Sequence, residues 1–311
     1  MTLDESISTD NGNPHVWMVT TAYNSVGRLS RYLECLIDQK YEPISLILVD
    51  HGTDSISGQL PLPENSIVLR GDPSHWWTQS VNIGIEYVLA KEGIRESDLI
   101  LLQNDDSTFG PNFVSELVNA VGGAHRIVGS VVIDRNTRGV LHANLKFDTI
   151  KAKYLYQHYG DHVADLGDSL IASDVLKGRG VAYPVKVVKE IGLLNTRLPH
   201  YRSDHEWAHR AKTIGVDVVV CPRAICETVI DTQAKISVLR PFATYWQVLF
   251  GRRSPANLRD MARYFYICYG PARASYCVFV NGLRTLLVST SQLFKVLVLK
   301  AIGDGGIGKT S

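Results

Sequence analysis

Short apolar runs alternate with amphipathic segments through the first half of the chain, and this order limits the fold more than any other feature. Each run has the length of a buried strand, and the segments between carry apolar residues at helical spacing. Such alternation is typical of a layered α/β fold with a mainly parallel sheet. Strands are predicted at 16–21, 44–50, 66–70, 99–103 and 127–133, and helices at 23–39, 77–90 and 112–121.

Charged residues are distributed unevenly along the chain. With 311 residues, 45% of them hydrophobic and 20% charged, the composition excludes collagen-like, disordered and coiled-coil chains. Residues 235–311 carry 11 Lys and Arg against two acids, a net +9, while the rest carries 21 basic and 29 acidic residues, a net −8. We therefore predict four segments: a flexible N-terminus at 1–14, the α/β domain at 15–234, a basic, mostly helical appendage at 235–302, and a flexible tail at 303–311.

The five cysteines are scattered and form no CxxC pair, which argues against a disulfide framework or a cysteine zinc site and favours a reducing compartment. The first fifteen residues are acidic and polar and lack the basic and apolar regions of a secretory signal. The sequence therefore predicts a cytoplasmic protein.

Polar side chains stand where the predicted strands end. Thr21, Asp50 and the pair Asp105 and Asp106 each follow an apolar run. Ligands of parallel sheets bind outside the carboxyl ends of the strands, so these residues are expected to share one crevice. Several carboxylates on one rim repel each other unless a cation lies between them, and carboxylate oxygens suit Mg²⁺ or Mn²⁺. A solvated Asn-Asp-Asp-Ser turn is the alternative, and the local sequence leaves both open.

A second polar cluster lies at 198–215. If Ser203 caps a helix, Asp204 and Glu206 fall in its first turn, where the helix dipole favours the ionised carboxylate, a form that can act as a general base. The same segment matches H-E-x-x-H through His205 and His209, which makes a zinc hydrolase an alternative. No His or Glu follows within two helical turns as a third ligand, although Glu227 stays open.

Six short motifs, each weak alone, follow one another along the chain: TAYN (21–24), LILVDHGTDS (46–55), HWWTQSVNIGIEY (75–87), LLQNDDS (101–107), KGRG (177–180) and HYRSDHEWAHRAKTIG (200–215). Together they resemble glycosyltransferase family 2, the inverting enzymes of the GT-A fold, and within it the rhamnosyltransferase-like branch. The resemblance covers roughly residues 15–230.

The resemblance implies transfer of a sugar, rhamnose in this branch, from a dTDP- or UDP-linked donor to a glycan or lipid-linked acceptor in surface polysaccharide synthesis. Asp106, helped by Asp105, matches the ligand of the Mg²⁺ or Mn²⁺ ion, and Asp204 matches the catalytic base, with Glu206 as the second choice. The donor is expected to contact Thr21, Tyr23, Asn24, Asp50, Trp77, Gln79, Asn82, Asn104, Asp105 and Arg179, and the acceptor His200, Trp207 and Arg210.

Two departures from the family pattern bear on the donor. His51 follows Asp50 where the family usually has Asp or Asn, which leaves the preference for base and ribose open. Asn104 replaces the first acid of the DxD motif, so the metal ion would rely on Asp106 with water or diphosphate oxygens. Trp77 is either a core residue or a stacking surface for the donor, and Trp207 fits packing better than acceptor stacking.

The basic appendage raises a separate question. Residues 278–302 are apolar, but Arg284 and Lys295 leave only ten uncharged positions between them, short of the ~20 residues that a spanning helix needs. The helices either lie on an anionic membrane surface, such as the inner face of the plasma membrane, or form a subdomain that covers the sheet or makes a homodimer. No nucleic-acid module is recognisable.

Two further possibilities were weighed. The last residues match G-x-x-x-x-G-K-[ST] at 303–310, but a phosphate-binding loop needs a helix after it, and the chain ends one residue later. This segment is therefore expected to be part of the flexible tail. A protein that binds a nucleotide sugar or another carbohydrate without turnover is the alternative function from a different class.

Overall fold

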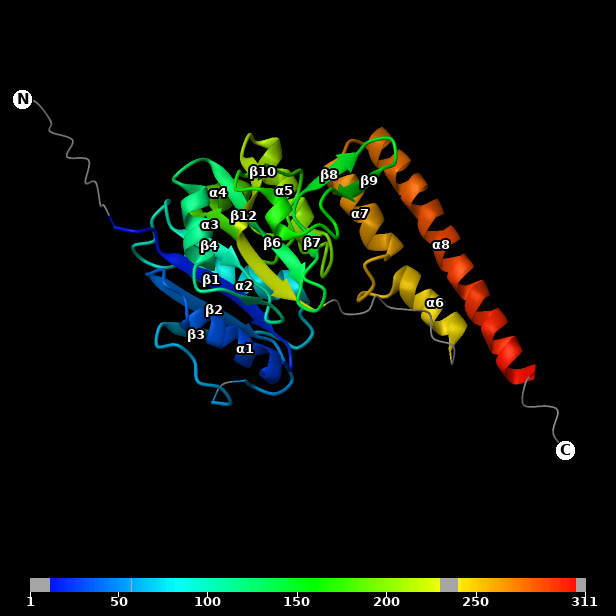
Figure 1. The fold of residues 1–311 in the computed structure, drawn as a ribbon, viewed down its shortest axis with the longest axis horizontal. Helices are drawn as coiled ribbons and strands as arrows, with labels where there is room; N and C mark the ends of the chain where they lie inside the picture. Colours follow the sequence, from blue (N-terminus) through cyan, green and yellow to red (C-terminus); the bar gives the residue numbers. More distant parts are fainter. Residues whose placement is uncertain (1–11, 57, 230–239, 306–311) are drawn as a thin grey trace, which may run out of the picture.

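The computed structural model describes residues 12–56, 58–229 and 240–305, with side chains as far as residue 298. An α/β body occupies most of the molecule, and three C-terminal helices lie at one end of it (Figure 1). The predicted boundary at 234/235 and most of the two predicted flexible ends lie outside the described residues.

Four parallel strands form one half of the sheet. β1 lies between β2 and β4, and β3 pairs with the other edge of β2. These strands are continuous apolar runs because helices cover both faces of the sheet. The strands are β1 (Val16–Ala22), β2 (Ile44–Asp50), β3 (Ser66–Arg70) and β4 (Leu99–Leu102). These are the first four of the five predicted strands, and all four are confirmed, with β4 ending one residue early.

The other half of the sheet is mixed. β11 (Val181–Pro184) is antiparallel to both β4 and β6 (Arg126–Asp134), and β6 pairs in parallel with the long β12 (Asp217–Thr228). Among the described residues the sheet has ten strands in the order β10-β12-β6-β11-β4-β1-β2-β3, with β5 on β12 and β7 on β6. The shorter elements are β5 (Thr108–Phe109), β7 (Val140–His142), β10 (Ile171–Ala172), the hairpin β8 (Leu145–Asp148) and β9 (Lys153–Tyr156), and a 3₁₀ turn at Val163–Leu166.

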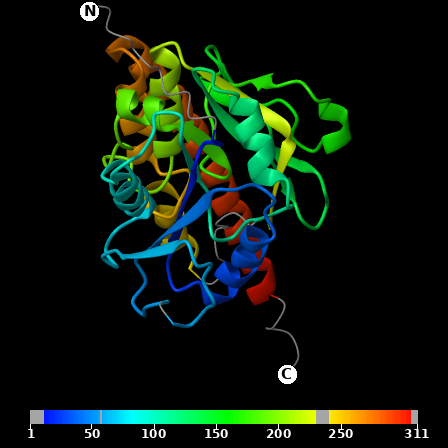
Figure 2. The same ribbon diagram turned by 90° about the vertical axis from the view of Figure 1, so that its left-hand side faces the viewer.

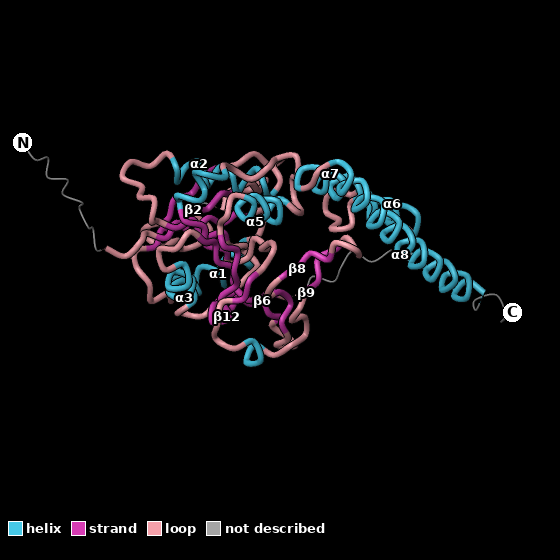
Figure 3. Tube along the Cα trace, turned by 90° about the horizontal axis from the view of Figure 1, so that it is seen from above, coloured by secondary structure: helices cyan, strands magenta, loops and turns pink. Residues whose placement is uncertain are grey.

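Helices cover the sheet on both sides, so the body has three layers (Figure 3). Alternate residues of β1 show the division: Trp17 and Val19 pack in one buried cluster, and Val16 and Met18 in the other. The first face is covered by α2 (Trp77–Leu89), α4 (Val185–Ile191) and α5 (Ser203–Thr213), and the second by α1 (Val26–Ile37) and α3 (Phe113–Val121). The α/β architecture predicted from the sequence is confirmed.

Three helices follow the last strand: α6 (Pro241–Phe250), α7 (Leu258–Cys268) and α8 (Pro271–Gly305). A separate buried cluster joins α7 and α8 to Leu198 and Ala152 of the α/β body, while α6 contacts α8. Seen from the side of the sheet, α8 lies behind the body (Figure 2). No described helix combines the length and the apolar character required to cross a membrane. α8 extends to Gly305, into the segment predicted to be a flexible tail.

The start of α5 differs from the prediction. Ser203 is the first helical residue, and the preceding Arg202, with a φ of 73°, holds the cap position. The Ser203 hydroxyl is buried and lies 2.7 Å from the Thr78 hydroxyl on α2, so it joins two elements and caps neither. Asp204 and Glu206 still fall in the first turn, as predicted.

Two isoleucines test the layered packing. Ile85 on α2 is 0% exposed in the core, whereas Ile37 at the end of α1 is 62% exposed. We expect Ile85→Ala to lower the free energy of unfolding by about 2–5 kcal/mol, because it removes a packed side chain and leaves a cavity. Ile37→Ala is the matched control and should change it by less than about 0.5 kcal/mol. Denaturant titration measures both, and equal effects would contradict this placement of the two helices.

Candidate active site

A cavity of about 530 Å³ opens at the carboxyl ends of β1 and β4. It is bounded by the segment after β4, the segment before β11, the start of α5 and the loop after α6. Its lining residues are Thr21, Arg28, Trp77, Asn104, Asp105, Asp106, Tyr156, Lys177, Gly178, Arg179, His200, Tyr201, Arg202, Asp204, His205 and Pro255. We call it the strand-end pocket.

The oxygen-rich triplet 104–106 forms one wall of the strand-end pocket. Asn104 accepts a hydrogen bond from the Trp77 indole at 3.2 Å, and Asp105 accepts one from the Ser25 hydroxyl. Asp106 forms an ion pair with Arg179 at 2.8 Å. Burial raises the pKa of Asp105, an effect that the Ser25 hydrogen bond opposes. The triplet therefore places two adjacent carboxylates in the pocket, one hydrogen-bonded to a serine and the other paired with an arginine.

Sheet pairing brings the KGRG segment against this triplet. β11 runs antiparallel to β4 with Val181 opposite Leu102, and the Gly180 amide donates to the Leu102 carbonyl at 2.9 Å. Gly180 has a φ of +68°, and a Cβ there would lie 2.5 Å from the Ser130 hydroxyl, so only glycine fits. A Cβ on Gly178 would meet the Trp77 ring at 2.8 Å. Glycines thus let the backbone before β11 enter the pocket.

Asp204 lies at the N-terminus of α5 and faces the same pocket. One carboxylate oxygen accepts from the Gly178 amide at 3.0 Å, and the other accepts from the His205 amide at 2.8 Å. These two N–H groups fix the orientation of the carboxylate. An oriented carboxylate in a pocket can accept a proton from a bound hydroxyl group.

Lys177 is the main pocket residue that sequence reasoning missed. Burial lowers its pKa to about 8, although the nearby Asp204 opposes the shift. Its Nζ lies 3.1 Å from His142 Nε2 and 4.6 Å from the centre of the Tyr156 ring. Burial also lowers the pKa of His205 to about 4, so that imidazole is neutral at pH 7. The KGRG motif already contained Lys177, whereas no motif pointed to the strands that supply His142 and Tyr156.

Several predicted ligand residues are corrected by the structure. Trp207 is fully buried, packs on Tyr183 and donates to the Gly192 carbonyl at 2.7 Å, so it cannot contact an acceptor. Arg210 and Glu206 form a two-armed ion pair with contacts of 3.0 and 2.7 Å. That pairing takes up both Glu206 oxygens, and neither residue lines the strand-end pocket, so the structure does not favour Glu206 as the base or Arg210 as an acceptor contact.

Three residues expected at the donor have other partners in the structure. Asp50 is fully buried: it accepts from the amides of Gly52 and Ile56 and pairs with Arg70 at 2.9 Å, so it shapes a turn, and its contact with the donor's base stays a prediction. Both groups of the Asn82 amide bond to the backbone of Leu194. The third is Gln79, which accepts from the Trp76 amide and lies outside the strand-end pocket.

Other predicted residues lie in or beside the strand-end pocket. Thr21, Trp77 and His200 line it together with the triplet, Arg179 and Asp204. Trp77 is partly buried against the core and lines the pocket at the same time, so both interpretations of it hold in part. Tyr23 and Asn24 are exposed just beyond β1, where the Tyr23 ring lies 5.3 Å from His51. The expected contacts of these two residues with the donor stay predictions.

The zinc-hydrolase alternative lacks its ligand set. His209 points to the Cys268 carbonyl, at 3.0 Å, and Glu206 is held by Arg210. Within residues 12–56, 58–229 and 240–305, no three His, Cys, Asp or Glu side chains converge as metal ligands. The two carboxylates of the triplet alone would leave the remaining coordination positions to a substrate, which is how Mg²⁺ is commonly bound with phosphates.

Comparison with known families decides the class. Residues 14–248 match the family model described as glycosyltransferase like family 2. The chain belongs to this family. No curated protein sequence matches it.

Solved structures agree in fold. The chain is similar to GalNAc-T7 in complex with UDP, GalNAc and Mn²⁺ (13% identity, TM-score 0.57, 84% of this chain and 52% of that one). It is also similar to the mannosyltransferase PcManGT from Pyrobaculum calidifontis with GDP-Man and Mn²⁺ (12%, 0.56, 96% and 77%) and to S. aureus TarS (13%, 0.54, 91% and 54%). The chain thus spans about half of the GalNAc-T7 and TarS chains. At these identities the likeness shows the GT-A fold, as predicted, and the rhamnosyltransferase-like branch stays a prediction.

The lowered pKa of Lys177 predicts how binding of a diphosphate depends on pH. The protonated amine attracts the anion and the neutral amine does not, so the affinity for UDP should fall by up to about tenfold per pH unit above pH 8. Lys177→Arg keeps the charge at all these pH values and should flatten the profile. Calorimetric titrations between pH 6.5 and 9.5 measure both proteins. Parallel profiles for the two would contradict a role for Lys177.

Proposed function

We propose that this protein is a metal-dependent, inverting glycosyltransferase that transfers a sugar from a nucleoside-diphosphate donor to an acceptor hydroxyl. One observation carries the proposal: the strand-end pocket holds the triplet 104–106 and the cations Lys177 and Arg179 together with Asp204, which comes from a different element. The first group suits a diphosphate and its metal ion, and Asp204 suits a proton acceptor.

The triplet fits a hard divalent cation. Asp105 and Asp106 both line the pocket and offer carboxylate oxygens, the ligands that Mg²⁺ and Mn²⁺ prefer. These side chains would hold the ion, which supplies positive charge to the leaving diphosphate. The structures of GalNAc-T7 and PcManGT contain Mn²⁺ together with UDP or GDP-Man, which supports the use of a metal ion here.

Lys177 and Arg179 add the protein's own positive charge. Arg179 already lies against Asp106, so its guanidinium is placed beside the position of the metal ion and the diphosphate. Both cations are largely removed from water, which strengthens their attraction for an anion. Their role is to stabilise the nucleoside diphosphate as the bond to the sugar breaks.

Asp204 is the proposed general base. In a single displacement, the acceptor oxygen forms a bond to the anomeric carbon while the bond from that carbon to the diphosphate oxygen breaks. The acceptor hydroxyl proton passes to the Asp204 carboxylate, and the electron pair of the broken bond leaves with the nucleoside diphosphate. Attack opposite the leaving group inverts the anomeric configuration.

The finer assignments rest on the motif resemblance. We propose rhamnose as the transferred sugar, dTDP or UDP as its carrier, and a glycan or lipid-linked acceptor of surface polysaccharide synthesis. The alternative, a protein that binds nucleotide sugars without turnover, has one distinguishing result: donor binding without release of nucleoside diphosphate for any acceptor.

Replacement of the base separates binding from chemistry. Asp204→Asn is expected to lower the transfer rate by about 10²–10⁴-fold, because the amide cannot take the proton. Binding of UDP should change little, since the metal and the cations are untouched. Donor hydrolysis or transfer assays and calorimetry measure the two quantities. Asp168→Asn, at an exposed loop position, is the matched control, and full activity of Asp204→Asn would contradict the assigned role.

Replacement of the metal ligand has a different signature. Asp106→Asn should abolish most of the increase in UDP affinity that Mn²⁺ produces, because an amide oxygen binds a hard cation less strongly than a carboxylate. Calorimetry with Mn²⁺ and with a chelator measures that increase for both proteins. An unchanged Mn²⁺ effect in Asp106→Asn would contradict the metal site.

A further inference from the structure

Lys177 is held in the strand-end pocket by uncharged neighbours. Its ammonium group forms no ion pair with a carboxylate that the structure describes. The Nζ atom lies 3.1 Å from His142 Nε2 and 4.6 Å from the centre of the Tyr156 ring. Burial lowers the pKa of His142 well below its ordinary value, so the imidazole is neutral and can accept a hydrogen bond from the ammonium. The position of Lys177 therefore depends on one imidazole and one aromatic ring.

Tyr156 is the last residue of the hairpin of β8 and β9, which forms a two-stranded sheet of its own. The base of the hairpin is bonded to the segment just before Lys177. The Phe147 amide donates to the Asp174 carboxylate at 2.7 Å, and the Asp174 amide donates to the Leu145 carbonyl at 2.8 Å. An isolated pair of strands is only marginally stable in water. The place of Tyr156 therefore depends on what the rest of the hairpin contacts.

α8 holds the turn of this hairpin, and Figure 1 shows the two lying side by side. Three α8 side chains donate hydrogen bonds to the carbonyls of three successive turn residues: Tyr276 to Ile150 and Arg284 to Lys151, both at 2.6 Å, and Asn281 to Ala152. Arg284 also donates to the Asn281 side chain at 3.0 Å, which fixes these two donors relative to each other. Of the described residues of α8, none lines the strand-end pocket. The hairpin therefore connects α8 to the pocket.

α7 contacts the middle of the hairpin. Strand alternation puts Tyr154 on the same face of β9 as Tyr156. The Tyr154 hydroxyl is hydrogen-bonded to the Tyr264 hydroxyl of α7, and the Tyr154 ring lies 5.4 Å from the His205 ring of α5. Phe147 and Tyr154 pack against the buried cluster that joins α7 and α8 to the body. The hairpin thus contacts both the C-terminal helices and the walls of the pocket.

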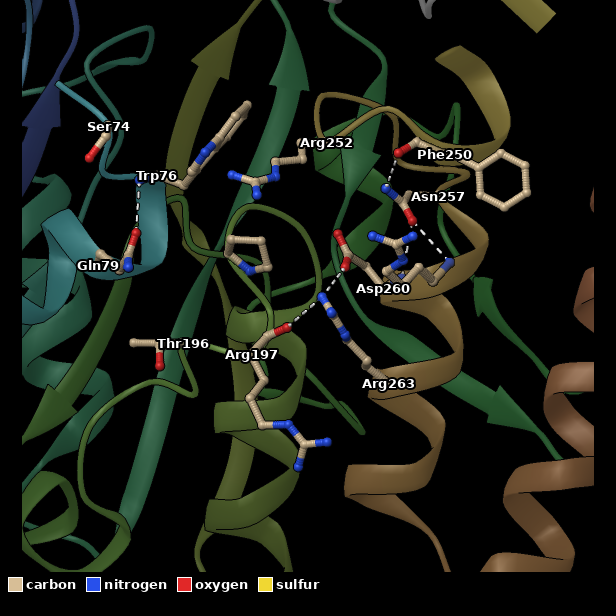
Figure 4. Close-up of a pocket in the computed structure, with 12 residues that line it drawn as sticks. Ser74, Trp76, Gln79, Thr196, Arg197, Phe250, Arg252, Asn257, Asp260 and Arg263 are labelled. Atoms are coloured by element: carbon tan, nitrogen blue, oxygen red, sulfur yellow. Dashed lines mark hydrogen bonds and ion pairs between the residues drawn. The ribbon is translucent and has the colours of Figure 1, made fainter. Parts of the chain in front are cut away.

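On another side the C-terminal helices stand apart from the body. A cavity of about 620 Å³ lies between the end of α6 and the first turns of α7, on one side, and the residues before α2 and the loop before α5, on the other (Figure 4). Arg197 of the body and Arg252 and Arg263 of the helical segment line it, and Arg263 donates to the Arg197 carbonyl at 3.4 Å. The hairpin is therefore the more closely packed connection of the C-terminal helices to the body.

We infer that Tyr156 positions Lys177 for binding of the diphosphate, and that α8 positions Tyr156 by holding the turn of the hairpin. The ring face stabilises the ammonium by a cation–π contact, for which 4.6 Å is within the usual limit of about 6 Å. When the turn is released, the ring can move away and Lys177 loses one of its two contacts. This inference rests on the proposed function, since it concerns how Lys177 meets the donor.

Variants of Tyr156 test the first step. UDP is titrated by calorimetry into the full-length protein in the presence of Mn²⁺. We expect Tyr156→Leu to weaken UDP binding by about threefold to tenfold, because leucine fills the space but offers no ring face to the ammonium. Tyr156→Phe keeps the ring and should stay within about 1.5-fold of the wild type. Tyr159→Leu, at a position that is 63% exposed, is the matched control and should also stay within about 1.5-fold.

Variants of α8 test the second step. Tyr276→Phe/Arg284→Met removes two of the three bonds to the turn and should weaken UDP binding by at least about threefold, although neither residue lines the pocket. Tyr245→Phe/Lys295→Met is the matched control, because Tyr245 on α6 bonds to Thr290 of α8 and Lys295 is exposed on α8. This control also removes one hydroxyl and one charge, and it should stay within about 1.5-fold of the wild type.

Lys177→Met separates positioning from a purely structural role. If Tyr156 and α8 act through Lys177, their variants should weaken UDP binding no further once residue 177 is methionine. The same weakening in the Lys177→Met protein as in the wild type would overturn the inference. Wild-type affinity in Tyr156→Leu or in the α8 double variant would overturn it as well, and so would equal effects of the α8 variant and its control.

The reaction of Lys177 with acetic anhydride is a second measurement, and it needs no nucleotide. Only the neutral amine reacts, so loss of the ring contact should raise the rate by at least about twofold in Tyr156→Leu and in the α8 double variant. The exposed Lys189 on α4 is the internal reference, and mass spectrometry of the peptides reads both lysines. Tyr156→Phe should react as the wild type does. Unchanged rates in the first two variants would overturn the inference.

The two measurements let the two proposals fail separately. Absent UDP binding in the wild-type protein rejects the proposed function, and the acetylation rates then still test whether Tyr156 and α8 hold Lys177. Normal UDP binding, with affinities and rates that none of these variants changes, rejects only the inference about the hairpin.

Discussion

The antiparallel pairing of β11 with β4 is the constraint on which the rest of the site depends. β4 ends where β11 begins, so the segment after one strand and the segment before the other must occupy the same edge of the sheet. This pairing places Asp106 within 2.8 Å of Arg179 although 73 residues separate them. The parallel neighbour β1 ends at the same edge and adds Thr21 to the pocket. Acidic and basic groups that would be costly to remove from water alone are thereby paired and partly buried together.

The sequence pattern was sufficient to predict the elements whose structure depends mainly on residues close to them in the chain. The apolar runs of β1 to β4 and the polar residues that follow them gave the sheet edge, and the first turn of α5 gave Asp204. The antiparallel insertion of β11 could not be predicted, because a four-residue strand carries no signal for the direction of its partner. Trp207 and Asn82 were assigned to ligands because they are polar or aromatic and lie near motif residues. Their helices turn them inward, and only the packed structure shows that direction.

The fold shows where several basic residues of the C-terminal segment lie. The C-terminal segment is strongly basic, but sequence alone does not say where its arginines gather. The start of α7 and the loop before it bring Arg252 and Arg259 to the cavity that Arg197 of the α/β body also lines.

In the proposed reaction, the leaving group and the base act in one displacement from different walls of the strand-end pocket. The measurement that tests this step is the anomeric configuration of the product, read by NMR from the one-bond carbon–proton coupling constant at the anomeric carbon of the newly attached sugar. Inversion relative to the donor is the predicted result. Retention of configuration would contradict the single displacement and the role assigned to Asp204.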